Sequence, residues 1–293
     1  MSLVSVIIPV YNAQDTLRRC LDSVINQTHK DLQIIVINDG STDGSMEIAK
    51  QYPFKILDCP HSGVSQARNK GLEVATGEYI YFMDADDYFI TCEAIASLFK
   101  YSADLVIEGA INLVNDYLLR PNKNIAFAFV WGKLFKQSII REHCIRFNEL
   151  MRKHEDTEFV FHYLQYAKTL AFTGSNNYVH NRLLSGAGME IFDSSADCER
   201  LLVQITQFGM PQFLINHCRI SLKIVEIIRA YRLTFMEHYC FIIDLLDNLL
   251  IRHSLKSYKT FPGNSKIIPF LIRHRLYLLL TFVCRTRGRK RYG

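Results

Sequence analysis

The sequence predicts an α/β protein with a mostly parallel, doubly wound sheet, followed by a helical C-terminal region. Short β-branched or aromatic runs alternate with helical patterns up to Ile107, and polar clusters follow the ends of these runs. Beyond Asp197 the apolar residues recur at helical spacing only. We therefore expect a first domain over residues 1–195 and a helical region with a basic tail over residues 196–293.

Each element of the first half follows from a local pattern. Val4–Val10 is a β-branched run and is expected to be the first strand. Apolar residues at helical spacing over Leu17–Asn26 predict a helix. Gln33–Ile37 is a second buried run, and the polar residues Asn38–Asp43 form the turn after it. The next expected strands are Phe54–Leu57, Tyr79–Met83 and Leu105–Ile107, and the next helices are Val64–Ala75 and Ile95–Phe99.

The pattern becomes less regular from about Leu113. A helix over Asp156–Tyr166 is well supported by its apolar spacing. The other expected elements are a loop at Asn115–Asn124, strands at Phe127–Phe129, Leu170–Phe172 and Asn177–His180, a short helix at Lys136–His143, a flexible loop at Leu184–Gly188, and turns near Gly209–Pro211 and Pro262–Asn264.

The composition is that of an ordinary globular protein. Of 293 residues, 49% are apolar and 22% are charged, so the chain can bury a large core. Eight cysteines occur without a Cys-x-x-Cys pair, so we interpret them as reduced thiols of a cytoplasmic protein. We expect no signal peptide, because a strand pattern begins almost at once, and no membrane-spanning helix, because uninterrupted runs of about 18 apolar residues are absent.

The net charge of +5 hides an asymmetry along the chain. Residues 252–293 contain eleven Lys or Arg and no Asp or Glu, whereas the preceding part has 23 basic and 29 acidic residues. Within this tail we expect Leu271, Leu278 and Phe282 to share one helix face before a polybasic run. Such a tail predicts an anchor on an anionic membrane surface. The alternative is a core-packing last helix with a solvated tail.

A nucleic acid partner is not expected, because no recognised binding fold or aromatic interleaving accompanies these charges.

Three carboxylates, Asp84, Asp86 and Asp87, follow the apolar run Tyr79–Met83. A short apolar run of this kind is typical of a buried parallel strand, so the carboxylates are expected at its C-terminal end, where open α/β sheets bind ligands. Carboxylates this close repel one another unless a cation joins them, and their oxygens suit Mg²⁺ or Mn²⁺. The alternative is a solvated acidic turn, and the motif alone does not decide between the two.

Polar residues follow three of the expected strands, in the segments Pro9-Val10-Tyr11-Asn12, Asn38-Asp39-Gly40-Ser41 and Asp84-Ala85-Asp86-Asp87. The chain has neither Gly-x-Gly-x-x-Gly after the first strand nor Gly-x-x-x-x-Gly-Lys-Ser/Thr, which argues against dinucleotide and P-loop chemistry. Asp39 can accept a hydrogen bond from a base N–H, and Tyr11 can stack on or flank that base. The three clusters therefore predict a nucleotide pocket at one edge of the sheet.

Five segments in order resemble the family 2 glycosyltransferases of GT-A fold. These segments are Val4–Asn12, Asp39–Asp43, Gly63–Gly71, Gly77–Ile80 and Asp84–Asp87. The resemblance covers roughly residues 3–185, and several ordered motifs together are far more specific than any one alone. It implies transfer of a sugar, with inversion, from a nucleotide-diphosphate donor, expected to be a UDP-sugar. The acceptor would be a hydroxyl of a glycan or lipid-linked molecule in cell-surface polysaccharide synthesis.

The resemblance also implies roles for single residues. Asp39 is similar to the base-binding aspartate, and the Pro9–Tyr11 backbone to the uridine wall. Arg68 resembles the basic residue near the base and diphosphate, with a surface ion pair as the alternative. Asp86 would bind Mn²⁺ or Mg²⁺, and Asp84 would hold the ribose or reach the metal, directly or through a water.

Two later motifs extend the resemblance more weakly. Trp131–Lys136 resembles the Trp-x-Lys-Leu segment, which makes Lys133 a candidate binding residue; the alternative is a core Trp with a solvated Lys. Glu155 and Asp156 resemble the pair that opens a helix and supplies the catalytic base. We assign the base to Asp156, with Glu155 as the alternate, although an acid at a helix N-terminus is also simply a good cap.

The sequence departs from the family pattern in two places. Asn38 stands where many relatives carry Asp, and the stretch between Glu108 and Trp131 is short. His180 and Arg182 precede the Leu184–Gly188 loop; a metal or diphosphate role is one interpretation, and a structural histidine, which we favour, is the other.

Two other functions fit part of the pattern. A sugar-nucleotide nucleotidyltransferase needs a Gly-rich loop bearing Arg and Lys after the first strand, which Tyr11–Gln14 is not. A catalytically silent, membrane-tethered binding module would not need Asp86 and Asp156, which are both present. We therefore predict a metal-dependent hexosyltransferase-type enzyme in the cytoplasm, peripheral on the inner face of the membrane.

Overall fold

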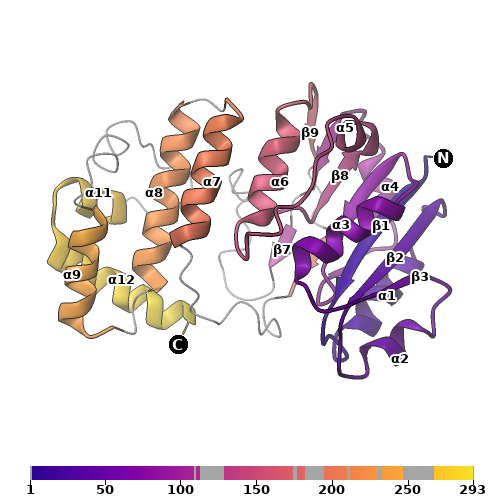
Figure 1. Ribbon diagram of the computed structural model, residues 1–293, viewed down its shortest axis with the longest axis horizontal. Helices are drawn as coiled ribbons and strands as arrows, with labels where there is room; N and C mark the ends of the chain where they lie inside the picture. The colour runs from indigo at the N-terminus through magenta and orange to yellow at the C-terminus, as the bar shows by residue number, and fades with distance from the viewer. Residues whose placement is uncertain are drawn as a thin grey trace. The chain divides into compact units, whose positions relative to one another are not determined.

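The chain forms two compact units, Met1–Gly188 and Met189–Gly293, in a computed structural model (Figure 1). The structure describes residues 2–108, 110–112, 129–173, 177–181, 195–209, 212–229, 233–246 and 267–292. Several predicted features lie wholly or mostly outside these residues: the loop at Asn115–Asn124, the strand at Phe127–Phe129, Arg182, the loop at Leu184–Gly188, and the turns at Gly209–Pro211 and Pro262–Asn264. The domain boundary expected at residues 195/196 stays a prediction.

The first unit is built on a seven-stranded sheet in the order β3-β2-β1-β4-β8-β6-β9 (Figure 1). Its strands are β1 (Val4–Val10), β2 (Leu32–Asp39), β3 (Lys55–Cys59), β4 (Tyr79–Phe82), β6 (Leu105–Ile107), β8 (Lys133–Lys136) and β9 (Leu170–Phe172). All neighbouring pairs are parallel except those of β8, which runs antiparallel to both β4 and β6. The predicted mostly parallel, doubly wound sheet is therefore confirmed.

A second, three-stranded sheet has the order β5-β10-β7. Its strands are β5 (Tyr88–Phe89), β7 (Ala110–Asn112) and β10 (Tyr178–His180). β5 is antiparallel to β10, with Tyr88 opposite Val179 and Phe89 opposite Tyr178. This pairing brings the end of β10 to the acidic segment Asp84–Asp87, about ninety residues earlier in the chain.

Helices cover both faces of the large sheet because successive side chains of β1 point to opposite sides. Val4, Val6, Ile8 and Val10 belong to a core shared with α1 (Leu17–Ile25), α2 (Ser45–Ala49) and α4 (Ala94–Leu98). Ile7 belongs to a second core shared with α3 (Val64–Val74), α5 (Gln137–Glu142) and α6 (Glu155–Leu164). Every side chain in these two cores is nearly or fully buried, so the strands need apolar residues on both faces.

Close packing of α3 depends on Gly71. A Cβ atom at this position would lie 2.4 Å from Cγ2 of Ile7 and 3.1 Å from Cδ1 of Ile37. The missing side chain lets the helix approach β1 and β2, and this approach sets where Arg68, one turn earlier, meets the sheet edge.

The second unit is helical in its described residues. It contains α7 (Ser195–Gln207), α8 (Gln212–Arg229), α9 (Phe235–Leu246), α11 (Ile267–Arg273) and α12 (Tyr277–Tyr292). Its core is formed by buried residues of the last four of these helices: Ile220, Ile227, Ile228, Ile242, Leu246, Ile268, Leu271, Ile272, Leu280 and Cys284. Among the helices that the structure describes, none is both long and apolar enough to cross a membrane.

Candidate functional site

The candidate site lies where three parallel strands end at one edge of the large sheet. β1, β2 and β4 run in the same direction, with Ile7 opposite both Ile35 and Phe82. The residues that follow them therefore meet at their C-terminal ends, the edge at which open α/β sheets bind ligands. Tyr11, Asp39 and Asp84 come to this edge as predicted from the sequence.

Arg68 of α3 contacts three acidic residues of the site, Asp84, Glu155 and Asp156. Its guanidinium donates to Oδ1 of Asp84 at 2.8 Å and to Oδ1 of Asp156 at 2.6 Å. Oε1 of Glu155 lies 3.6 Å from the same guanidinium. Arg68 is only 3% exposed, so the alternative of a surface ion pair is wrong. Burial lowers the pKa of Arg68, but the three carboxylates outweigh it and raise the pKa above the ordinary value, which keeps the guanidinium charged.

The acidic pair at the start of α6 splits into two environments. Asp156 is buried, and its carboxylate accepts hydrogen bonds from the guanidinium of Arg68 and from the backbone N–H of Val130 at 3.3 Å. Burial raises its pKa, while Arg68 opposes that rise. Glu155 is only partly buried, and burial together with the charge of Asp156 raises its pKa to about 8. The Arg68 guanidinium lies 2.6 Å from Asp156 and 3.6 Å from Glu155. A close opposite charge favours the ionised form that a general base requires, so Asp156 is the better candidate.

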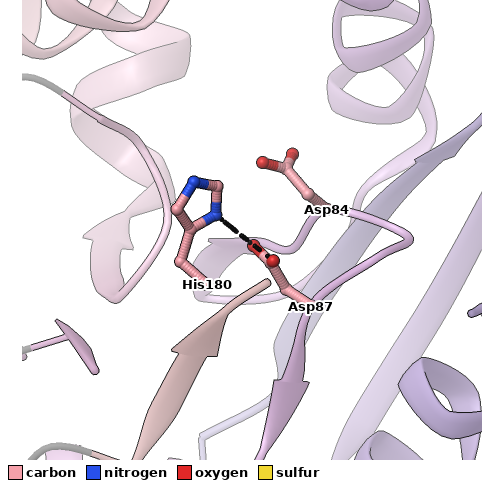
Figure 2. Close-up of side chains that lie close together, drawn as sticks. All are labelled: Asp84, Asp87 and His180. Atoms are coloured by element: carbon pink, nitrogen blue, oxygen red, sulfur yellow. Dashed lines mark hydrogen bonds and ion pairs between the residues drawn. The ribbon is translucent and has the colours of Figure 1, made fainter. Parts of the chain in front are cut away.

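A second acidic cluster joins Asp84 to Asp87 and His180 (Figure 2). One potential ligand atom from each of these three residues lies within 4.8 Å of the others. Asp87 is fully buried, and its carboxylate accepts from the hydroxyl of Tyr178 and from the backbone N–H of Asn181 at 2.8 Å. Asp87 therefore anchors β10, and the alternative of a solvated acidic turn is wrong for this residue.

His180 is oriented by Asp87. Its Nδ1 lies 3.2 Å and 3.3 Å from the two carboxylate oxygens of Asp87, so Nδ1 carries the hydrogen. The other ring nitrogen points away from Asp87 (Figure 2). A carboxylate that holds one nitrogen of a histidine commonly prepares the other for a metal ion. Sequence reasoning favoured a structural histidine, whereas the geometry puts His180 among the candidate ligands.

Asp86, the expected metal ligand, is half-buried beside this cluster but is not one of its three members. Burial and the charges of Asp87 and Asp84 raise its pKa to about 7. Its role as a ligand stays a prediction.

Asp39 is held by the loop that precedes α3. Its carboxylate oxygens accept from the backbone N–H groups of Ser62 at 2.8 Å and Gly63 at 3.0 Å, and Asp39 is only 4% exposed. Tyr11 is about half exposed and stacks on the ring of His61, with the centroids 4.1 Å apart. His61 has no recognisable spacing to other motifs, so sequence reasoning missed it. Pro9 and Val10 are the last residues of β1, directly before Tyr11, and Val10 is buried.

Asn38, the departure from the family pattern, fixes the turn after β2. Its side chain donates to Asp58 and accepts from the backbone N–H of Ser41, both at 2.9 Å.

Lys133 is buried on β8, so the alternative of a core Trp with a solvated Lys is wrong. Its Nζ donates to the carbonyl oxygen of Trp131 at 3.3 Å, and burial lowers its pKa to about 7. Trp131 stacks on Tyr178 and on His180, with centroids 5.3 Å and 5.0 Å away. Trp131 therefore packs against the cluster of Asp84, Asp87 and His180 through its contact with His180. Direct contact of Lys133 with a donor stays a prediction.

Comparison with known proteins supports this description. The model of the family described as glycosyl transferase family 2 matches residues 5–143. The poly(ribitol-phosphate) beta-glucosyltransferase of Bacillus spizizenii is 31% identical over 215 residues, which cover 64% of this chain and 33% of that protein. The chain spans between 25% and 60% of the length of the curated relatives that it matches most strongly.

Two solved structures share the fold. TarS 1-349 of S. aureus in complex with UDP-GlcNAc aligns with a TM-score of 0.66 and 16% identity, covering 98% of this chain and 91% of that one. The mannosyltransferase PcManGT from Pyrobaculum calidifontis, in complex with GDP-Man and Mn²⁺, aligns with a TM-score of 0.53 and 15% identity, covering 97% and 87%. Residues 5–143 therefore form a glycosyl transferase family 2 domain, and the sheet to which they contribute has the GT-A fold.

Proposed function

We propose that this protein transfers a sugar from a UDP-sugar to an acceptor hydroxyl, with inversion at the anomeric carbon. The observation that carries the proposal is the Arg68 cluster, in which one buried guanidinium joins Asp84, the proposed donor-side residue, to Asp156, the proposed base. A direct displacement needs a carboxylate that can take the acceptor proton, and Asp156 is the candidate. It also needs donor and acceptor held in line, which supplies much of the rate enhancement. The protein needs no covalent nucleophile for this reaction.

The donor site is proposed to use a divalent cation. Asp84 and His180 would hold it, with Asp86 beside them, and Asp87 would orient His180. Carboxylates alone suit Mg²⁺ as well as Mn²⁺, but an imidazole ligand favours a transition-metal ion, so we propose Mn²⁺. When bound, such an ion supplies Lewis-acid stabilisation to the leaving diphosphate. The Mn²⁺ in the mannosyltransferase structure supports this choice.

The acceptor is proposed to be a cell-surface polymer or its lipid-linked precursor. The named activity of the Bacillus spizizenii relative supports a polymer acceptor, and the UDP-GlcNAc bound to TarS supports a uridine donor. The sugar itself is left open by the described residues.

A thermal-shift panel of nucleotide sugars with Mn²⁺ tests the donor, because a ligand that binds only the folded chain raises its melting temperature. We expect a UDP-sugar to give the largest shift, and the same UDP-sugar to be consumed with Mn²⁺ present. Stabilisation only by a guanosine or cytidine donor would refute uridine. Stabilisation by none, together with no donor turnover, would refute the proposed transfer.

We also propose that the helical unit docks on an anionic membrane surface. Leu278, Leu279 and Phe282 on α12 are all more than half exposed, as are Ile267 and Phe270 on α11. Leu271, which was expected to share this face, is instead buried in the helical core, so that part of the prediction is wrong. An exposed apolar face in a segment with eleven cations and no acid fits a lipid headgroup region.

Flotation with vesicles containing phosphatidylserine tests the docking. Truncation after Cys284 would remove the last turns of α12, which runs to Tyr292, directly after its core residue Cys284. Substitutions test the exposed face without shortening the helix. We expect Leu278→Ser with Phe282→Ser to reduce vesicle binding several-fold, and Val203→Ser, an exposed apolar site on α7, to leave it unchanged. Equal flotation of all variants, or none at low salt, would contradict the proposal.

A further inference from the structure

Asn69, the residue after Arg68 on α3, uses its whole side chain to hold the segment between α5 and α6. Its Oδ1 accepts from the backbone N–H of Phe147, and its Nδ2 donates to the carbonyl oxygen of Phe147, both at 2.9 Å. Nδ2 also donates to Oε1 of Glu149 at 2.9 Å. Asn69 is only 6% exposed, so both ends of its amide are satisfied inside the protein. The side chain therefore fixes the backbone of Phe147 against α3.

The ring of Phe147 connects this fixed backbone to the Arg68 cluster. It stacks on the ring of Phe159 in α6, with centroids 4.2 Å apart and an interplanar angle of 11°. It meets the ring of Phe82 in β4 edge to face, with centroids 5.2 Å apart. The guanidinium carbon of Arg68 lies 5.2 Å from the centre of the Phe147 ring, within the range of a cation–π contact. One buried ring thus contacts α3, β4 and α6.

The contact with Phe159 bears on Asp156 because the two residues are three positions apart on α6, so their side chains are neighbours on the helix surface. The bond from Arg68 to Oδ1 of Asp156 is 2.6 Å long, and a displaced α6 would lengthen it. A catalytic group displaced by about 1 Å can lose about a hundredfold in rate. The position of α6 relative to α3 is therefore a property on which the proposed base depends.

We propose that Asn69 and Phe147 are positioning residues for the base: Asn69 fixes the backbone of Phe147, and the Phe147 ring holds α6 where Asp156 meets Arg68. Neither residue is proposed to touch donor or acceptor. This inference rests on the proposed role of Asp156 and adds two residues that act through it.

Asn69→Leu removes the three hydrogen bonds and keeps a side chain of similar size. We expect the turnover of a UDP-sugar with Mn²⁺ to fall at least about tenfold. The affinity for UDP with Mn²⁺, measured by calorimetry, should stay within about twofold, because the substitution acts on the base and not on the donor.

Gln27→Leu is the matched control, because Gln27 is also a buried amide that joins two segments. Its Nε2 donates to the carbonyl oxygen of Thr91 at 2.9 Å, and its Oε1 accepts from the backbone N–H of Ile95 at 3.0 Å. These partners belong to the segment after β5. We expect Gln27→Leu to lower the melting temperature as Asn69→Leu does, while the turnover of the folded protein is retained.

A double-mutant cycle in urea tests the placement of α6 without using activity. Asp156→Asn removes the charge that is paired with Arg68, and its effect on the free energy of unfolding should be clearly smaller in the Asn69→Leu background. In the Gln27→Leu background its effect should be unchanged. Phe147→Leu keeps the backbone bonds and removes the ring, so it should show the same coupling and the same loss of turnover. It decides the question if Asn69→Leu does not fold.

Additive effects in the cycles of both Asn69→Leu and Phe147→Leu would overturn the inference, because α6 would then be held independently of them. Unchanged turnover in both variants, or an equal loss of turnover in Gln27→Leu, would also overturn it. If Asp156→Asn leaves turnover unchanged, the proposed base fails, and the positioning of a base fails with it. Additive cycles together with an inactive Asp156→Asn variant overturn this inference alone.

Discussion

Replacing Lys133 with methionine is expected to stabilise the protein at neutral pH. Lys133 is only 2% exposed, and its Nζ donates to the carbonyl oxygen of Trp131. An ammonium group has three donors, so burial at this position leaves it poorly satisfied. Methionine keeps an unbranched apolar stem of similar length and removes the charge. The charge of Asp156 stays paired with Arg68 in the variant.

The magnitude follows from the pKa of Lys133, which burial lowers from 10.5 to about 7. In the unfolded chain the amine is protonated at pH 7, whereas in the folded chain it is only about half protonated. With about 1.4 kcal/mol per pKa unit, the burial of Lys133 costs at most about 4 kcal/mol at pH 7. Methionine removes this cost, but loss of the hydrogen bond to Trp131 offsets about 1–2 kcal/mol of the resulting stabilisation. We expect a net stabilisation of about 2–3 kcal/mol.

The pH dependence has a definite sign. Because the folded pKa lies below the unfolded pKa, the unfolded state binds more protons between pH 7 and 10.5, and the stability of the unaltered chain rises with pH in that range. At pH 9.5 the cost of burying Lys133 falls to about 1 kcal/mol. The advantage of the methionine variant should therefore shrink by about 3 kcal/mol between pH 7 and pH 9.5.

Urea unfolding followed by tryptophan fluorescence measures both effects. Trp131 is the single tryptophan of the chain, so the signal reports on the segment that contains Lys133. All other ionisable groups are the same in the two proteins, which makes the difference between them specific to Lys133. A variant that is less stable at pH 7, or a stability gap that does not change with pH, would refute the reasoning and show that Lys133 is charged and well paired.

The remaining predictions concern catalysis and packing. Asp86→Ala should abolish transfer while the melting temperature is retained, and full activity of the unaltered chain in excess chelator would rule out the metal requirement. Asp156→Asn should lower turnover at least about a hundredfold with donor affinity preserved, as measured by steady-state kinetics and calorimetry. If Glu155→Gln has this effect and Asp156→Asn does not, the base is Glu155. Gly71→Ala should destabilise the first unit by about 1–3 kcal/mol in urea, because its Cβ would overlap Ile7; unchanged stability would show that α3 can shift without cost.

The sequence predicted the central strands because both of their faces are buried. Val4–Val10 and Gln33–Ile37 read as largely apolar runs, and such runs have few interpretations. β8 was missed for the opposite reason. Lys133 and Lys136 flank its two apolar residues, and only the tertiary structure shows that Lys133 is buried between β4 and β6. β5 was also missed, since two residues give no periodicity and its partner β10 is about ninety positions away.

The site was predictable as a set of residues but not as an arrangement. Asp84 and Asp156 stand out by motif, yet the contacts that join them through Arg68 span 16 and 88 residues. Local patterns carry no information about such pairs. The same holds for Asp87, whose bonds to Tyr178 and Asn181 cross more than 90 residues. His61 gave no signal, because its contacts with Asp39 and Tyr11 form only in the folded chain.

Charge balance explains why these arrangements matter for a cation. Asp84, Glu155 and Asp156 share the single positive charge of Arg68, and Asp86 and Asp87 add two further carboxylates next to them. A solvated acidic turn would leave such carboxylates ionised at little cost. Burial penalises their charged forms and adds to the effect of their repulsion, and together these raise the pKa values of Asp86, Asp87 and Glu155. The sequence alone left a cation site and an acidic turn equally acceptable; burial at the end of β4 is the property that favours the cation site.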